Sequence, residues 1–344
     1  MNKQIQQLSG ELTPVEANPL VSVIIDNYNY AQYLPEAIES VLNQSYRNFE
    51  LIVVDDGSKD NSREVIESYS DRLNAIFQPN GGQGSALTTG ITNAKGQIIC
   101  FLDADDYFHK DKLAKVVASF QAHPDWVQIS HCHLLVDRQG APLGPGSVVL
   151  SQGDVRDLLL QWGRYAWGLT SGLAFRREVL QKVVPIPPKP RSADTYLTST
   201  VPFYGKVGCI NETLMFYRVH GKNMQAYNDD TAWLMQIREE TAACINNAAA
   251  KTGLTERFNI QERDADYRSL KAVHAGGVPL KTAAQIIWLS IQESSAIGRS
   301  PRDTLKRLIR RSMFVIFPSE SKIILRYGIV GYLRFKFTGK QPQR

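Results

Sequence analysis

Residues 49–58 read FELIVVDDGS, an apolar run rich in β-branched residues that stops at two aspartates, a glycine and a serine. Such a run is typical of a strand buried on both faces, and the polar residues mark its end. The same pattern occurs earlier as VSVIIDN at 21–27 and later as IICFLDADD at 98–106, with a shorter apolar run at 75–77. These stretches predict four strands.

Helical patterns separate the predicted strands. Apolar residues recur at helical spacing between residues 32 and 43, and a second helix is expected at 61–69. A third follows the glycine-rich turn at 80–84, and a fourth ends near residue 121. This alternation predicts an α/β fold, in which a mostly parallel sheet carries helices on both faces.

Carboxylates follow three of the predicted strands, at Asp26, at Asp55 and Asp56, and at 103–106. Ligands of parallel sheets bind beyond the carboxyl ends of the strands, so we expect these carboxylates along one rim. Crowded carboxylates repel one another unless a cation or hydrogen bonds offset the repulsion, and oxygen ligands favour Mg²⁺ or Mn²⁺. A nucleotide diphosphate would supply further oxygens to such a cation.

Each acidic cluster also has a purely structural interpretation. The aspartates at 103–106 could form a solvated turn that caps the next helix. The segment 55–58 could be a tight turn that needs glycine at positive φ. The residues alone leave these alternatives open.

The chain changes character near Asn223. Between 127 and 220, strand-like and helix-like segments mix. Beyond Asn223, five segments have the pattern of helices: 231–251, 264–275, 280–297, 302–317 and 322–337. We therefore expect an arm at 1–20, an α/β domain at 21–222 and a C-terminal helical extension at 223–344.

Composition restricts the class of protein. Hydrophobic residues make up 43% of the 344 residues, enough for a buried core. The four cysteines lack metal-type spacing, and we expect the reduced thiols of a cytoplasmic protein. The first 18 residues lack the apolar segment of a signal peptide, and no apolar run is long enough for a transmembrane helix, so neither is expected.

The C-terminal segment is strongly basic. From Arg299 to Arg344 the chain carries 12 lysines and arginines and 2 acidic residues, although the formal net charge of the whole is only +5. Basic and apolar residues alternate from Arg302 to Arg311, as in a helix that lies on an anionic membrane surface. A packed helix with a solvated charged face explains the pattern equally well. No recognised nucleic-acid motif accompanies the charge, so no nucleic-acid partner is expected.

Four blocks carry a family resemblance: VSVIIDNYN at 21–29, AIESVLNQSY at 37–46, VVDDGS at 53–58 and FLDADD at 101–106. Their order and spacing resemble the family 2 glycosyltransferases of the non-processive type, which have the Rossmann-like GT-A fold. Weaker similarity continues to about residue 222. The helical extension lies outside it.

The resemblance implies which residues bind the nucleotide. Asp56 matches the carboxylate that binds a uracil-type base, Tyr28 the aromatic ring that stacks near it, and Asp103 the carboxylate directed toward the ribose. Many relatives have proline or threonine where this chain has Asp26. This additional carboxylate is expected to hydrogen-bond the nucleotide or to change the base preference.

The resemblance also implies a metal site and a general base. Asp105 matches the metal ligand of the D-x-D pair, and His220 matches a histidine that some members use near the metal and the diphosphate. Asp194 falls where the family has its general base. An N-cap role for Asp194 and a loop role for His220 are the alternatives from the residues themselves.

These assignments imply an inverting enzyme that transfers a single sugar from a nucleotide-sugar, expected to be a UDP-sugar, to a glycan or lipid-linked acceptor, with Mg²⁺ or Mn²⁺ as cofactor. Ala86-Leu87-Thr88 replaces the family's Ala-Arg-Asn, so a cationic contact to the donor is lost or supplied elsewhere. The processive Gln-x-x-Arg-Trp signature is missing after Asp194. A nucleotidyltransferase, which would need a glycine- and arginine-rich loop at 26–29, and a catalytically silent binding protein are the alternatives.

Overall fold

The computed structural model describes residues 12–146, 149–187, 192–220, 230–316 and 320–338. The chain forms two compact units. The first comprises residues up to Arg156, Ala166–Val219 and Asn247–Thr255, and the second comprises Asp157–Tyr165, His220–Asn246 and Glu256–Arg344. The chain therefore passes from the first unit to the second between Val219 and His220. Two short segments are exceptions: Asp157–Tyr165 belongs to the second unit and Asn247–Thr255 to the first.

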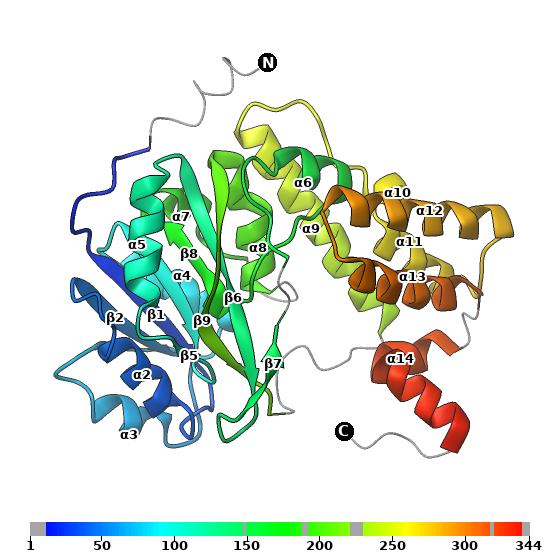
Figure 1. Cartoon of the computed structure of the whole chain (residues 1–344). Coiled ribbons are helices and arrows are strands. Elements are labelled where there is room, and N and C mark those ends of the chain that lie inside the picture. Colours follow the sequence, from blue (N-terminus) through cyan, green and yellow to red (C-terminus); the bar gives the residue numbers. More distant parts are fainter. Residues whose placement is uncertain (1–11, 147–148, 188–191, 221–229, 317–319, 339–344) are drawn as a thin grey trace. The chain divides into compact units, whose positions relative to one another are not determined.

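The first unit is built on one mixed sheet with the strand order β3-β2-β1-β4-β8-β6-β9-β5, in which β7 pairs with β6 (Figure 1). The strands are β1 Val21–Asn27, β2 Phe49–Asp55, β3 Asn74–Phe77, β4 Ile98–Asp103, β5 Tyr107–Phe108, β6 Trp126–Val136, β7 Pro142–Pro145, β8 Leu173–Arg176 and β9 Lys206–Arg218. The first four strands are parallel, as predicted. Beyond them β8 runs antiparallel to both its neighbours, and β9 is parallel to β6.

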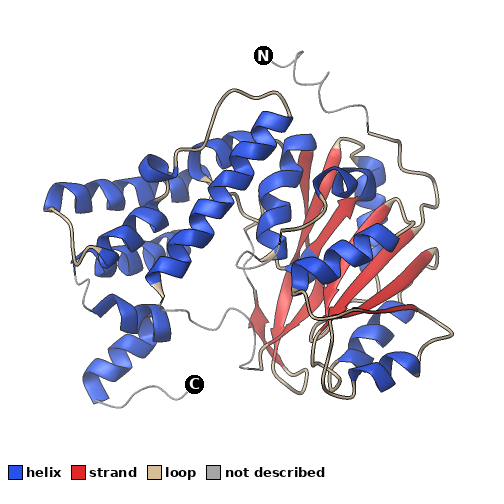
Figure 2. Cartoon of the chain, turned by 180° about the vertical axis from the view of Figure 1, so that it is seen from behind, coloured by secondary structure: helices blue, strands red, loops and turns tan. Residues whose placement is uncertain are grey.

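Helices cover both faces of this sheet (Figures 1 and 2), which confirms the predicted layers. They are α2 Leu34–Leu42, α3 Ser62–Glu67, α4 Gln83–Asn93, α5 Lys112–Ala122, α7 Arg177–Val183 and α8 Ala193–Thr200. Successive side chains of a strand point to opposite faces of the sheet, so β1 contributes residues to two hydrophobic cores. Val23 packs in one core with residues of α2 and α5, and Ile24 packs in the other with residues of α4 and α7.

The second unit is helical. Five of its helices follow the predicted segments: α9 Thr231–Lys251, α11 Ala265–His274, α12 Leu280–Ala296, α13 Pro301–Ile316 and α14 Ser321–Thr338. The short helix α10 Ile260–Arg263 was not predicted, and most of α6 Arg156–Trp162 also belongs to this unit. The last five residues of α9 belong to the first unit. Within the described ranges, no helix combines the length and the apolar character needed to cross a membrane.

The basic residues of α13 do not form a continuous solvated face. Arg311 is fully buried and donates to Asp266 at 2.9 Å and to Glu293 at 2.9 Å. Arg310 donates to Asp266 at 3.2 Å. The alternative of a packed helix with a solvated charged face therefore describes only part of α13: Arg302 and Lys306 are exposed, whereas Arg310 and Arg311 pair with acidic side chains of α11 and α12.

Candidate active site

The register of the sheet brings the predicted carboxylates together. In the pairing of β1 with β4, Asp26 lies opposite Asp103, and in the pairing of β1 with β2, Asn27 lies opposite Asp55. Because the three strands are parallel, their carboxyl ends share one rim of the sheet. The predicted rim of acidic residues is thus confirmed.

Three carboxylates lie close together just beyond β4. Oxygen atoms of Asp103, Asp105 and Asp106 lie within 4.8 Å of one another. Gln83 donates from Nε2 to Asp103 Oδ1 at 3.0 Å, and Asp105 is buried. Oxygen-only ligand sets of this kind suit Mg²⁺ or Mn²⁺.

The carboxylates of this cluster repel one another, and a nearby positive charge would stabilise their ionised forms. Burial raises the pKa of Asp103 and Asp106 well above the usual value, and neighbouring carboxylates raise it further. Burial likewise raises the pKa of Asp26 to about 7, where the Gln83 hydrogen bond opposes the shift and the charge of Asp105 adds to it. Within the described part of the chain, Asp26 Oδ1 accepts no hydrogen bond. A divalent cation would relieve this repulsion, so the residues fit such a cofactor.

Ser171 holds the acidic loop from the opposite side. It lies in a 3₁₀ turn, Thr170–Gly172. Its hydroxyl donates to Asp106 Oδ2 at 2.6 Å and accepts from the backbone N–H of Asp103 at 3.0 Å. Its carbonyl accepts from Lys112 Nζ at 2.5 Å. Lys112 is fully buried, which lowers its pKa to about 7, and its ammonium lies 3.5 Å from the Phe108 ring centroid.

Arg218, at the end of β9, fixes the same loop through its backbone and side chain. Its N–H donates to Asp106 Oδ1 at 3.1 Å, and its Nε donates to the carbonyl of Asp105 at 3.0 Å. The guanidinium also pairs with Glu36 and lies over the ring of Tyr33. Asp106 is therefore held by the protein on both oxygens.

Sequence reasoning missed Lys112, Ser171 and the structural role of Arg218. Lys112 stands four residues before Val116 and eight before Phe120, on the apolar stripe of α5. A lysine in an apolar stripe was the available signal of burial. Nothing in the sequence distinguishes Ser171, since the partners of its hydroxyl lie 65 and 68 residues away.

Asp56 braces the glycine-rich turn. Its oxygens accept the N–H groups of Gly81 at 2.9 Å and Gly82 at 2.7 Å, and Oδ1 also accepts from Gln78 at 2.7 Å. Gly57 has φ +74° and a Cβ there would lie 2.8 Å from a backbone nitrogen, so the predicted positive-φ glycine turn is confirmed. Tyr28 is 42% exposed at the end of β1.

Asp194 lies in the first turn of α8, and Ser192 is the N-cap residue, so the N-cap alternative for Asp194 is wrong. Asp194 Oδ1 accepts the N–H of Thr195 at 2.6 Å. Burial raises the pKa of Asp194, and its charge contributes to the raised pKa of Asp103. The charge of Asp194 is therefore felt at Asp103, although 91 residues separate the two in the sequence.

His220 is buried and opens the second unit, two residues after Arg218. Its role as a metal ligand stays a prediction.

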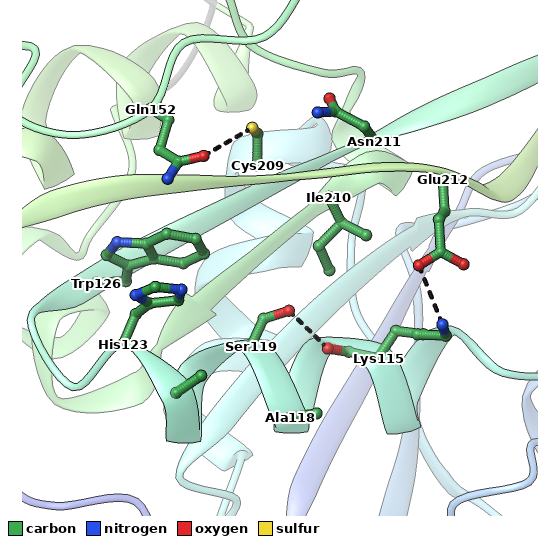
Figure 3. Close-up of a pocket in the computed structure, with 11 residues that line it drawn as sticks. Lys115, Ala118, Ser119, His123, Trp126, Gln152, Cys209, Ile210, Asn211 and Glu212 are labelled. Atoms are coloured by element: carbon green, nitrogen blue, oxygen red, sulfur yellow. Dashed lines mark hydrogen bonds and ion pairs between the residues drawn. The ribbon is translucent and has the colours of Figure 1, made fainter.

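A separate open hollow of about 430 Å³ lies between α5 and β9 (Figure 3). His123 stacks on Trp126 there with ring centroids 3.9 Å apart, and Lys115 pairs with Glu212 at 3.0 Å. None of the predicted site residues lines this hollow. The acidic rim, not the hollow, is therefore the candidate active site.

Ser171→Ala should weaken Mn²⁺ binding by about 10- to 100-fold, because it removes the hydroxyl that orients Asp106 and the start of the acidic loop. Titration calorimetry with Mn²⁺ measures this. Ser119→Ala is the matched control, since the Ser119 hydroxyl bonds only within its own helix, to the Lys115 carbonyl at 2.8 Å. Equal Mn²⁺ affinity in both variants would contradict the role given to Ser171.

The family model and the relatives that match this sequence are those of glycosyltransferases. The sequence model of glycosyl transferase family 2 matches residues 22–139. An uncharacterized glycosyltransferase of Nostoc sp. (strain PCC 7120) is 40% identical over 267 residues, covering 73% of this chain and 82% of the relative. TuaG of Bacillus subtilis, a candidate teichuronic acid biosynthesis glycosyltransferase, is 39% identical over 101 residues, which cover 28% of this chain and 40% of its own length.

Two solved structures share the fold. S. aureus TarS residues 1–349 in complex with UDP align with a TM-score of 0.50 and 18% identity, over 93% of this chain and 92% of theirs. The mannosyltransferase PcManGT from Pyrobaculum calidifontis, in complex with GDP-Man and Mn²⁺, aligns with a TM-score of 0.50 and 17% identity, over 98% of this chain and 93% of its own.

Proposed function

This chain belongs to glycosyl transferase family 2, and we propose that it is an inverting enzyme that moves a single sugar from a nucleotide-sugar to a glycan or lipid-linked acceptor. It is a glycosyltransferase with the GT-A fold. The observation that carries the proposal is the group of Asp103, Asp105 and Asp106 oxygens within 4.8 Å, with Asp26 opposite Asp103 in the sheet.

The donor would lie along the acidic rim. Asp103 would hold the ribose, and Asp105, with His220, would hold Mg²⁺ or Mn²⁺. Asp56 and Tyr28 would receive the base, with Asp26 beside it. The bound cation would stabilise the negative charge that develops on the departing diphosphate. UDP is the nucleotide we favour, since Asp56 matches the uracil-binding position and the structurally similar TarS fragment binds UDP.

Asp194 would act on the acceptor. A carboxylate whose pKa is raised by burial accepts a proton more readily than an exposed one, and this suits a general base. Asp194 would take the proton of the acceptor hydroxyl as the oxygen attacks the anomeric carbon opposite the leaving group. A single displacement inverts the anomeric configuration, and it needs no carboxylate nucleophile.

A donor panel tests this proposal. Purified protein is incubated with Mn²⁺ or Mg²⁺ and each of several nucleotide-sugars, and released nucleoside diphosphate is followed. We expect slow, cation-dependent hydrolysis of one donor. Release of pyrophosphate from a nucleoside triphosphate and a sugar phosphate would instead favour a nucleotidyltransferase. Neither turnover nor nucleotide binding with any donor would favour a catalytically silent protein.

We also propose that the enzyme works in the cytoplasm, at the inner face of the membrane, where a lipid-linked acceptor would be available. The outer stripe of α13, Arg302, Leu305, Lys306 and Ile309, supports this location. Leu305 is 57% and Ile309 41% exposed, and three- and four-residue spacing places all four on one face. Basic and apolar side chains on one exposed helix face suit the interface of an anionic bilayer.

Leu305→Ser with Lys306→Glu should reduce sedimentation with vesicles that contain phosphatidylglycerol, since it removes one apolar anchor and reverses one charge. This substitution is preferable to removing the whole segment, because Arg311 belongs to the interior of the second unit. Lys281→Glu, on the exposed surface of α12, is the control. Equal sedimentation of both variants and the parent protein would overturn the membrane proposal.

A further inference from the structure

The second unit contains a partly buried group of ionic side chains, which we call the arginine cluster. Its members are joined by shared ion pairs. They are Arg164, Arg238, Arg299, Arg307, Arg310 and Arg311, with the acidic residues Asp264, Asp266 and Glu293. Six guanidinium groups thus share three carboxylates, which leaves an excess of three positive charges.

The carboxylates are mostly used by four of the arginines. Asp264 pairs with Arg238 and also accepts the N–H groups of Asp266 and Tyr267 as the cap of α11. Asp266 accepts from Arg164 at 2.6 Å and from Arg311 at 2.9 Å. Glu293 accepts from Arg311 through Oε2 at 2.9 Å, whereas its Oε1 accepts no hydrogen bond from the described residues and lies 3.7 Å from Arg164 and 3.8 Å from Arg299. Three carboxylates cannot neutralise six guanidinium groups even with this oxygen in place.

Arg299 and Arg307 are the two that remain. Their nearest carboxylate oxygens lie at 3.8 Å on Glu293 and at 3.9 Å on Asp266, beyond hydrogen-bond range. Among the residues that the structure describes, Arg299 Nε has no acceptor, and neither does the Nε of the adjoining Arg164. A buried guanidinium without an acceptor is costly, because it has left water without gaining a partner.

The charge environment of these two side chains is unfavourable. Burial lowers the pKa of Arg307 to about 10 and lowers that of Arg299, and neighbouring arginines contribute to both shifts. A free arginine stays protonated above pH 12. Both side chains remain accessible, at 15% exposed for Arg299 and 28% for Arg307. A soluble anion can therefore reach them without unfolding the unit.

We propose that Arg299 and Arg307, with Arg164 Nε behind them, form a binding site for a phosphate-class oxyanion. Planar guanidinium forks match the oxygens of a phosphate in pairs, and a doubly charged anion would offset most of the excess charge. The phosphate belongs either to a soluble ion or to a lipid headgroup. This site is distinct from the acidic rim, and its existence does not depend on the proposed function.

The test compares phosphate binding in the parent protein and in Arg299→Gln with Arg307→Gln. The melting temperature and the calorimetric affinity are measured with inorganic phosphate and with pyrophosphate at constant ionic strength. EDTA is present, so that no cation bridges the anion to the acidic rim. We expect the double variant to bind the anion at least tenfold more weakly. Arg263→Gln, at an exposed position of α10 outside the α13 stripe, should bind as the parent does.

The same variants distinguish an anion site from a structural role. If the two arginines serve only to hold the helices together, the double variant melts lower than the parent, and phosphate has no effect on either. If they form an anion site, their removal relieves repulsion, so the phosphate-free variant melts no lower than the parent and only the parent is stabilised by phosphate. Equal phosphate responses in parent and double variant would also overturn the proposal.

The source of the phosphate is resolved with vesicles of phosphatidylcholine, with and without phosphatidic acid. A headgroup site predicts binding to the phosphatidic acid vesicles that the double variant loses and that free phosphate inhibits. A site for a soluble ion predicts calorimetric binding of free phosphate and equal vesicle binding by parent and double variant. Binding in neither arm would overturn the proposal.

Discussion

Asp105→Ala is expected to lower cation-dependent turnover of the nucleotide-sugar by roughly 10³-fold, since a bound metal supplies several kcal/mol of charge stabilisation at the leaving group. Asp105 is buried within the carboxylate group beyond β4, where its oxygens lie within 4.8 Å of those of Asp103 and Asp106. Release of nucleoside diphosphate, followed with saturating Mn²⁺, measures the effect.

The control for Asp105→Ala is Asp71→Ala, in which an aspartate with 80% of its side chain exposed is removed and turnover should not change. The melting temperature separates a lost metal ligand from a lost fold. Without metal, Asp105→Ala should melt no lower than the parent protein, because a repelling charge has been removed from the cluster. Full turnover by a folded Asp105→Ala variant would exclude Asp105 as a metal ligand.

Asp194→Asn should lower kcat by about 10²- to 10⁴-fold while nucleotide binding stays unchanged, because general-base assistance is lost and the donor contacts remain. The asparagine keeps the shape of the side chain and an oxygen that can accept the Thr195 N–H, so α8 should still begin correctly. Rates are measured with donor and acceptor, and calorimetry with the nucleoside diphosphate reports donor-site integrity. Thr198→Ser is a control on the same helix, and it retains the hydroxyl that bonds to the Asp194 carbonyl.

The pH dependence of Asp194 follows from its raised pKa. A general base works only when ionised, so kcat should fall as pH decreases through a pKa that lies above the ordinary aspartate value of 3.8. The residual activity of Asp194→Asn should lack this acid limb. An unchanged acid limb in that variant would assign the base to another residue.

The parallel half of the fold and the position of the acidic rim could be predicted from sequence, because short apolar runs followed by aspartates are local signals. Strand β9 could not. Its residues 211–213 are all exposed, where the pairing with β6 shifts register, so no alternation marks it as a strand. The strand nevertheless brings Arg218 to the acidic loop.

The parts of the site that sequence reasoning missed depend on long-range contacts. Asp106 was predicted only as part of the acidic cluster at 103–106, and the sequence did not reveal that Ser171 and Arg218, 65 and 112 residues away, hold its two oxygens. For the same reason, the number of basic residues in α13 did not reveal that two of its arginines are paired with acidic side chains. The acidic partners of Arg310 and Arg311 lie on α11 and α12, and no local pattern reveals them.

The most direct test of the central claim, that the acidic rim binds a nucleotide diphosphate through a divalent cation, is calorimetric titration of the protein with UDP and other nucleoside diphosphates, with Mn²⁺ and with EDTA. We predict that at least one of them binds in Mn²⁺ and that its affinity falls by at least tenfold in EDTA. Equal affinity under both conditions, or no binding of any nucleoside diphosphate in Mn²⁺, would contradict the account.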